Sequence, residues 1–150
     1  MYFDHNGNMQ KSNVIIVCGP PASGKTTFVK EHMKVGDCVI DLDLIKSALS
    51  MRGKTQITDN LLPTVLKIRD FLYTEIVANN IECETVWVIS GLPRERDRVE
   101  LKKQLDADIV CLDVPQDVCI DRAMLDGERK DKARQIEIIK KYFLKRNSEY

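Results

Sequence analysis

The sequence predicts an α/β protein built on a doubly wound parallel sheet that is flanked by helices. Two observations lead to this prediction: short apolar runs rich in β-branched residues recur along the chain, and longer stretches with helical spacing lie between them. Apolar runs without polar alternation are typical of strands whose two faces are both buried. A chain of 150 residues is long enough to form one domain with one core.

Four apolar runs are expected to be strands, and they cover residues 14–18, 38–40, 86–89 and 109–112. The stretches with helical spacing cover residues 26–33, 44–50, 61–78, 94–105, 116–125 and 133–145. Residues 1–12 are polar, so we expect a flexible tail followed by a single domain over residues 13–150. The polar segments 51–60 and 126–132 are expected to be connections, either plain solvated loops or segments that close over a ligand.

The composition excludes several classes of protein. No apolar run approaches the roughly 18 residues that cross a bilayer, and the first residues do not resemble a secretory signal, so we expect a soluble cytoplasmic protein without a membrane partner. The 23 basic and 23 acidic residues cancel, so any site for a polyanion must be local. The five cysteines lack C-x-x-C spacing and are expected to be free thiols in a reducing compartment.

Residues 19–26 read GPPASGKT and match the phosphate-binding pattern G-x-x-x-x-G-K-[ST] between an expected strand and an expected helix. Gly19 and Gly24 permit backbone angles that let successive N–H groups point at phosphate oxygens. Lys25 supplies a charge to the β- and γ-phosphates, and Thr26 offers its hydroxyl to Mg²⁺. We expect ATP to bind here, with contacts to Gly19, Ala22, Ser23, Gly24, Lys25, Thr26 and Thr27. The loop and its setting are typical of a P-loop NTPase-type sheet.

Two carboxylates follow the second expected strand. Because the carboxyl ends of parallel strands line the ligand crevice, Asp41 or Asp43 is expected beside the γ-phosphate. We favour Asp43 as a general base on an acceptor hydroxyl, and the alternative is that Asp43 caps the helix that follows. The third strand ends in Ser90, where many phosphate-loop enzymes carry a magnesium-binding acid.

Arginines gather near the segment 126–132. Arg129 is expected to neutralise charge on the transferring phosphoryl group, because a guanidinium can engage two oxygens at once. Arg122 is expected against the adenine ring, with an ion pair to a surface acid as the alternative. The lysines of the last helix are expected to form a solvated face, and a nucleic-acid contact is the alternative.

The chain resembles the small phosphate-loop kinases, and most closely the kinase domain of bacteriophage polynucleotide 5′-hydroxyl kinases. The resemblance rests on the phosphate loop, the D-x-D-x-x-K stretch of residues 41–46, the I-S-x-x-x-x-x-R-x-R run of residues 89–98, and D-V-P at residues 113–115 followed by Arg122. It implies that Asp43 is the general base, that Lys46 contacts the acceptor, that Arg122 contacts the nucleotide, and that Arg129 belongs to a lid. It also implies a sheet of four strands in the order 2-3-1-4.

The resemblance makes a phosphotransferase the leading hypothesis, with the γ-phosphate of ATP moving to a hydroxyl, most simply a nucleic-acid 5′-hydroxyl. Two positions depart from the polynucleotide kinase pattern: Lys46 stands where these kinases carry Arg, and Gly91 stands where they carry an acid. A kinase of metabolites or antibiotics is therefore the second hypothesis. An ATP-binding or ATP-hydrolysing module without kinase activity is the third.

Overall fold

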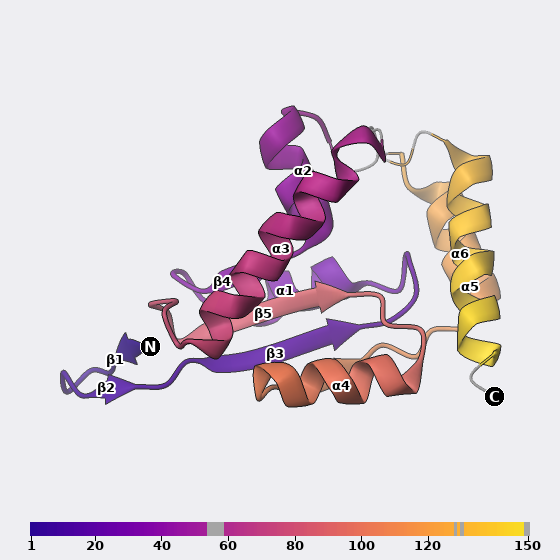
Figure 1. Ribbon diagram of the computed structural model, residues 1–150. Coiled ribbons are helices and arrows are strands. Elements are labelled where there is room, and N and C mark those ends of the chain that lie inside the picture. The colour runs from indigo at the N-terminus through magenta and orange to yellow at the C-terminus, as the bar shows by residue number, and fades with distance from the viewer. Residues whose placement is uncertain (54–58, 128, 130, 149–150) are drawn as a thin grey trace.

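A central sheet of four parallel strands organises the chain (Figure 1). The computed structural model describes residues 1–53, 59–127, 129 and 131–148. The sheet strands are β3 (Asn13–Cys18), β4 (Cys38–Ile40), β5 (Thr85–Ser90) and β6 (Asp108–Cys111). Their order is β4-β5-β3-β6, which confirms the predicted α/β fold class and the predicted strand order.

The parallel register brings the carboxyl ends of three strands level with one another. Cys18, the last residue of β3, pairs with Ser90 at the end of β5 and with Cys111 at the end of β6. The loops that follow these strands therefore begin at one edge of the sheet, which is where ligands bind in open α/β sheets.

All six expected helices are present, and each bound lies within two residues of its predicted position. The helices are α1 (Lys25–His32), α2 (Leu42–Ser50), α3 (Leu62–Val77), α4 (Glu95–Leu105), α5 (Gln116–Leu125) and α6 (Lys132–Asn147), with a 3₁₀ turn η1 (Asp59–Leu61) before α3. None of the helices in the described ranges is long and apolar enough to cross a membrane.

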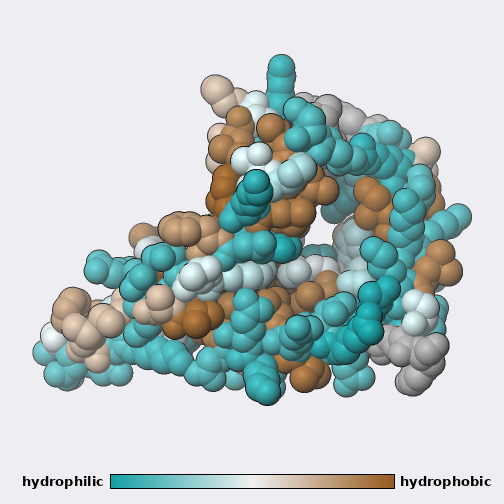
Figure 2. All heavy atoms as spheres, viewed as in Figure 1, coloured by the Kyte–Doolittle hydropathy of each residue, from teal (hydrophilic) through white to brown (hydrophobic). Residues whose placement is uncertain are grey.

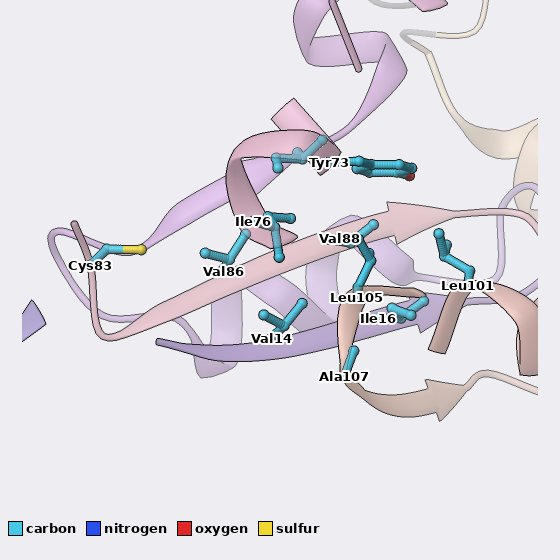
Figure 3. Close-up of a cluster of buried hydrophobic side chains, with 11 residues drawn as sticks. Val14, Ile16, Tyr73, Ile76, Cys83, Val86, Val88, Leu101, Leu105 and Ala107 are labelled. Carbon is cyan, nitrogen blue, oxygen red and sulfur yellow. The ribbon is translucent and has the colours of Figure 1, made fainter. Parts of the chain in front are cut away.

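Helices cover both faces of the sheet, as a doubly wound fold requires. On one face, side chains of α3 and α4 pack on alternate strand residues (Figure 3), and the core cluster there comprises Val14, Ile16, Ile40, Tyr73, Ile76, Cys83, Val86, Val88, Leu101, Leu105 and Ala107. On the other face, Val29 of α1 packs against Val17 and Trp87. Each fully buried aliphatic side chain contributes about 2 kcal/mol, so the sheet is a firm base for the loops at its edge.

Helices α5 and α6 stand beyond the carboxyl ends of the strands and pack mainly on each other (Figure 1). Their shared core consists of Cys119, Ala123, Ile139, Tyr142 and Phe143. Ala22 of the phosphate loop packs against the same cluster. The helix pair therefore touches the loop directly and forms one wall of the space above it.

The first residues form a two-stranded hairpin. Strand β1 (Tyr2–Phe3) pairs antiparallel with β2 (Met9–Gln10). The amino group of Met1 donates hydrogen bonds to Asn79 Oδ1, at 3.1 Å, and to the Ile81 carbonyl, at 2.6 Å. These partners lie far away in the sequence, so apolar periodicity could not predict the hairpin.

Candidate active site

A cavity of about 1170 Å³ opens at the carboxyl edge of the sheet. Figure 2 shows it as a hollow between the α2–α3 pair and the α5–α6 pair. The loop between β3 and α1 forms its floor, because residues 21–27 line it. Ligand pockets commonly measure about 300–1,000 Å³, so this cavity has room for a nucleotide and part of a second ligand.

The loop that floors the cavity has the backbone shape that its glycines permit. Gly24 has φ 95° and Gly19 has φ 152°, both in the region that favours glycine. A Cβ on Gly19 would lie 2.7 Å from the Leu112 carbonyl oxygen. Ala22 also has a positive φ, of 62°. Glycine is therefore required at position 19 both by conformation and by the close approach of Leu112, which follows β6.

The floor presents unused hydrogen-bond donors. Helix α1 begins directly after Gly24, which provides no side-chain cap, and its first turn contains no acidic residue. The N–H groups at this helix start are suited to binding an anion. The Ser23 hydroxyl is buried and has no hydrogen-bond partner among the described residues. A buried hydroxyl without a partner costs about 1–3 kcal/mol, so a bound phosphate oxygen would relieve a cost already present.

Lys25 lies folded over the loop. Its Nζ donates to the carbonyls of Gly19, at 2.9 Å, and Pro20, at 2.8 Å. Burial lowers the pKa of Lys25 to about 8, and the neighbouring charge of Asp41 opposes this shift. The ammonium therefore stays charged at pH 7 but loses its proton at a lower pH than an ordinary lysine does, and a phosphate anion beside it would favour the charged form.

Of the two acids after β4, Asp41 is the one that caps helix α2. Asp41 is the N-cap of α2, and its side chain accepts a hydrogen bond from the Asp43 backbone N–H at 3.4 Å. The alternative that Asp43 caps this helix is therefore wrong. Asp43 lies in the first turn of α2, and both carboxylates line the cavity.

Both predicted arginines line the cavity on the side opposite α2. Arg122 of α5 donates to the Ser23 carbonyl at 3.3 Å, so it is fastened to the phosphate loop. Arg129 donates to Asp126 Oδ2 at 3.2 Å and to Gln135 Oε1 at 2.6 Å. These bonds hold the Arg129 side chain at the cavity wall within the segment 126–132, of which residues 128 and 130 lie outside the described part of the chain.

Lys46 lies one turn after Asp43 on α2 and also lines the cavity. Among the described residues no hydrogen bond or ion pair involves its ammonium group. Of the eleven predicted site residues, ten line the cavity, and Gly19 lies behind it against Leu112. The predicted connection 51–60 includes residues 54–58, which are outside the described residues.

Two further cationic side chains, to which the sequence analysis gave no role, also line the cavity. Arg69 of α3 lies with its guanidinium 5.4 Å from the centre of the Tyr73 ring and donates to Asp70 Oδ1 at 2.9 Å. Arg134, at the start of α6, donates through Nη2 to both carboxylate oxygens of Asp59, at 3.0 and 2.9 Å. The Arg134–Asp59 pair thus joins α6 to η1 across the cavity. Helical spacing alone gave no signal for either arginine.

A partly buried chain of hydrogen bonds supports the loop from behind. The Tyr142 hydroxyl on α6 donates to the Gly91 carbonyl at 3.3 Å and accepts a bond from Arg98 Nη2 at 3.1 Å. The Gly91 carbonyl also accepts the Gly19 N–H at 3.2 Å. Arg98 further donates to the Leu92 carbonyl at 2.7 Å. These contacts connect α4, α6 and the phosphate loop through the turn that follows β5.

Comparisons with known proteins place this arrangement in a family. The profile of the family described as an AAA domain matches residues 14–137. This span covers the four strands of the central sheet except Asn13, the first residue of β3, and reaches into α6. No curated protein sequence gives a significant match to the chain.

Solved structures share the fold at low sequence identity. One chain of the Pnkp1/Rnl/Hen1 RNA repair complex matches with a TM-score of 0.63 and 16% identity, covering 98% of this chain and 49% of that one. Shikimate kinase from Bacteroides thetaiotaomicron matches with a TM-score of 0.60 and 20% identity, covering 90% of this chain and 80% of that one. A putative kinase from Chloroflexus aurantiacus matches with a TM-score of 0.54 and 16% identity, covering 87% of this chain and 78% of that one. The chain thus spans about half of its RNA repair neighbour and most of the two kinases.

Proposed function

Since the chain belongs to the AAA domain family and has a P-loop kinase-like fold, we propose that it transfers the γ-phosphate of ATP to a hydroxyl, most simply the 5′-hydroxyl of a nucleic acid. One observation carries the proposal: the carboxylate of Asp43 shares a cavity with Lys25 on its floor and Arg129 on its far side. This combination supplies a base, a phosphate-binding cation and an arginine for the transferring group.

In this proposal ATP places its phosphates on the floor of the cavity. The N–H groups at the start of α1 and the Ser23 hydroxyl bind phosphate oxygens. Lys25 exchanges its bonds with the loop carbonyls for bonds with the β- and γ-phosphates. Arg122, which is fastened to the loop, binds the nucleotide, and Arg129 stabilises charge on the moving phosphoryl group.

The residues present also fit Mg²⁺. The Thr26 hydroxyl lines the cavity beside Lys25 and would be a ligand of this cation, with phosphate oxygens and water as its other ligands. Asp41 lines the same cavity and would hold one of these waters. When bound, Mg²⁺ neutralises phosphate charge and so lowers the barrier to transfer.

Asp43 acts as the general base. The acceptor oxygen forms a bond to the γ-phosphorus while the bond from that phosphorus to the β–γ bridging oxygen breaks, and ADP leaves. The proton of the acceptor hydroxyl passes to the Asp43 carboxylate. Since Asp41 already accepts a backbone hydrogen bond as the helix cap, Asp43 is the better candidate for this step.

The cations beside Asp43 support an acceptor that carries an anionic group near its hydroxyl. Lys46 lines the cavity without a partner in the described part of the chain, and Arg69 lies on the adjoining helix. A nucleic-acid end offers phosphates at this place, and the fold shared with a chain of an RNA repair complex supports that acceptor. Residues 46 and 69 would bind the backbone phosphate next to the terminal nucleotide.

The decisive experiment is transfer of labelled γ-phosphate from ATP to DNA and RNA oligonucleotides with 5′-hydroxyl ends. We expect Asp43→Asn to lower the rate of transfer by about 10²–10⁴-fold, the usual contribution of a general base, while ATP affinity stays within about threefold of the wild-type value. Asp117→Asn is the matched control, because Asp117 occupies the first turn of α5 but does not line the cavity. Equal transfer rates for Asp43→Asn and wild type would refute the assignment.

A small anionic alcohol is the second candidate acceptor, and the high coverage of shikimate kinase, 80% of that chain, supports it. An acceptor screen coupled to ADP release would separate the two candidates. Turnover that appears only with a small hydroxy acid, and never with 5′-hydroxyl ends, would replace the nucleic-acid proposal. ADP release that needs no acceptor and persists in Asp43→Asn would instead indicate an ATPase module.

A further inference from the structure

Two cysteines face each other at the base of the phosphate loop. Cys18 is the last residue of β3 and Cys111 is the last residue of β6, and the two are direct partners in the parallel register. Their Sγ atoms lie 2.9 Å apart. Both are free thiols in this structure.

The backbone already has the spacing that a disulfide needs. Neighbouring strands lie about 4.8 Å apart, and the Cα atoms of disulfide-linked cysteines are commonly about 4.4–6.8 Å apart. A bond between these two sulfurs therefore requires only a small displacement of the strand ends. The site lies outside the residues assigned to nucleotide and acceptor.

The two thiols differ in their access to solvent. Cys111 is exposed on β6, an edge strand of the sheet, whereas Cys18 is fully buried. Burial and the adjacent Cys111 raise the pKa of Cys18 to about 12. Cys18 therefore remains a protonated thiol at neutral pH, and Cys111 is the sulfur that a dissolved oxidant reaches first.

We propose that Cys18 and Cys111 are a redox modification site, which a hydroperoxide converts to a reversible disulfide. The Cys111 sulfur attacks the peroxide O–O bond, forming a sulfenic acid and releasing one water. The Cys18 sulfur then displaces the hydroxyl from Cys111, and this hydroxyl leaves with the Cys18 proton as a second water. Two thiols lose two electrons in total, and hydrogen peroxide is reduced to two waters. Contact between the sulfurs favours the second step despite the protonated state of Cys18.

The disulfide would act on the phosphate loop because the loop starts at the next residue. The Cys18 carbonyl accepts the Leu112 N–H at 2.8 Å, and Gly19 lies so close to Leu112 that an added Cβ would be 2.7 Å from the Leu112 carbonyl oxygen. A new bond that draws the ends of β3 and β6 into disulfide geometry therefore shifts Gly19. We expect ATP to bind about tenfold more weakly to the oxidised protein. This effect rests on ATP binding in the proposed function, whereas formation of the disulfide does not.

The first test is chemical and uses the full chain, reduced and then treated with hydrogen peroxide. Thiol counting is expected to show the loss of two thiols, and mass spectrometry of a digest is expected to show one linked Cys18–Cys111 peptide that dithiothreitol removes. Cys111→Ser should abolish this peptide. Cys38→Ser is the matched control and should preserve it, because Cys38 and Cys83 pack together in a different cluster. Oxidation that stops at a sulfinic acid on Cys111 without a linked peptide would overturn the proposal.

The second test measures ATP affinity by calorimetry for the reduced, oxidised and re-reduced protein. A loss of affinity that dithiothreitol reverses, and that Cys111→Ser does not show, is expected. If the linked peptide forms and ATP affinity is unchanged, the connection to the loop is wrong while the modification site stands. If the reduced protein does not bind ATP at all, the proposed function fails, and the digest still decides whether the disulfide forms.

Discussion

The phosphate loop that floors the cavity is held by buried backbone contacts, whereas the helices that wall the cavity meet through exposed side chains. On the floor, the Gly19 N–H is bonded to the Gly91 carbonyl, and a Cβ on Gly19 would collide with Leu112. At the rim, Arg134 and Asp59 join α6 to η1 with side chains that are 48% and 65% exposed. The contacts of the floor are close packing and a backbone hydrogen bond, whereas an exposed ion pair such as the one at the rim contributes little stability.

This difference separates two tasks that the proposed phosphoryl transfer would require. Binding a triphosphate requires donors that are already in place, because reorganising them would cost affinity. Admitting an acceptor and releasing a product requires walls that separate and close again. Substitutions on the floor should therefore change stability and ATP affinity strongly, and substitutions at the rim should change mainly rates of exchange.

The largest effect is expected for Gly19→Ala. The added Cβ would lie 2.7 Å from the Leu112 carbonyl oxygen at a φ of 152°. We expect the free energy of unfolding to fall by about 3 kcal/mol, from strain and overpacking together, and ATP affinity to fall more than tenfold. Urea denaturation and nucleotide titration would measure these quantities.

Gly36→Ala is the matched control for this substitution. Gly36 also has a positive φ, of 96°, but a Cβ added there would meet nothing within 4 Å, and the residue lies outside the loop. We expect a loss of about 1 kcal/mol from backbone strain alone, with no change in ATP affinity. Equal losses of stability at positions 19 and 36 would show that the close approach of Leu112 does not constrain the floor.

A smaller effect is expected from the titration of Lys25. Its pKa of about 8 in the free protein implies that the ammonium is charged at pH 7 and mostly neutral at pH 9. ATP affinity should therefore fall about tenfold between these pH values, because binding at pH 9 requires uptake of a proton. Calorimetry in two buffers of different ionisation enthalpy would detect the proton.

Titration of Lys25 should raise the stability of the free protein with pH, whereas it lowers ATP affinity. The folded-state pKa lies below the ordinary value of 10.5, so between about pH 8 and 10.5 the unfolded chain binds more protons and this contribution to stability rises with pH. In Lys25→Met both trends should disappear. If the fall in ATP affinity with pH persists in Lys25→Met, another group is responsible for it.

The difference between floor and walls also explains what the sequence could predict. The floor is contiguous: residues 19–26 carry the glycines, the lysine and the threonine at fixed spacing, and buried apolar runs predicted the strand before them and the sheet around them. The position of Asp43 at the cavity followed from the rule that ligands bind at the carboxyl ends of parallel strands. Arg129 was expected there from the chemistry of a guanidinium in the charged segment 126–132 and from the resemblance to the phosphate-loop kinases. Local pattern and general topology were sufficient for these residues.

The walls depend on pairs that are distant in the sequence. Arg134 and Asp59 are separated by 75 positions, and Arg98 and Tyr142 by 44. Neither pair has a spacing that a single sequence reveals, because the helices that carry them meet only through the tertiary fold. Asp41 was missed as the helix cap for a different reason: two acids at alternate positions are both plausible caps, and only the backbone angles decide between them.

The smallest effect on stability is expected at the rim, from the Arg134–Asp59 pair. A double-mutant cycle with Arg134→Gln and Asp59→Asn should give a coupling free energy below about 1 kcal/mol, as for other exposed ion pairs. The rate of nucleotide release should nevertheless rise about two- to fivefold in either variant, because the pair joins the two walls above the cavity. Stopped-flow measurements with a fluorescent ATP analogue would give this rate.

The Lys141–Glu137 pair is the control for the Arg134–Asp59 pair, because it is an exposed ion pair that does not join the two walls. Its side chains are 66% and 64% exposed, and its N–O distance is 3.2 Å, but both residues lie on α6. Breaking it with Lys141→Gln should change stability by a similar small amount and leave nucleotide release unaltered. If breaking either pair changes the release rate equally, the Arg134–Asp59 contact between α6 and η1 does not hold the cavity closed.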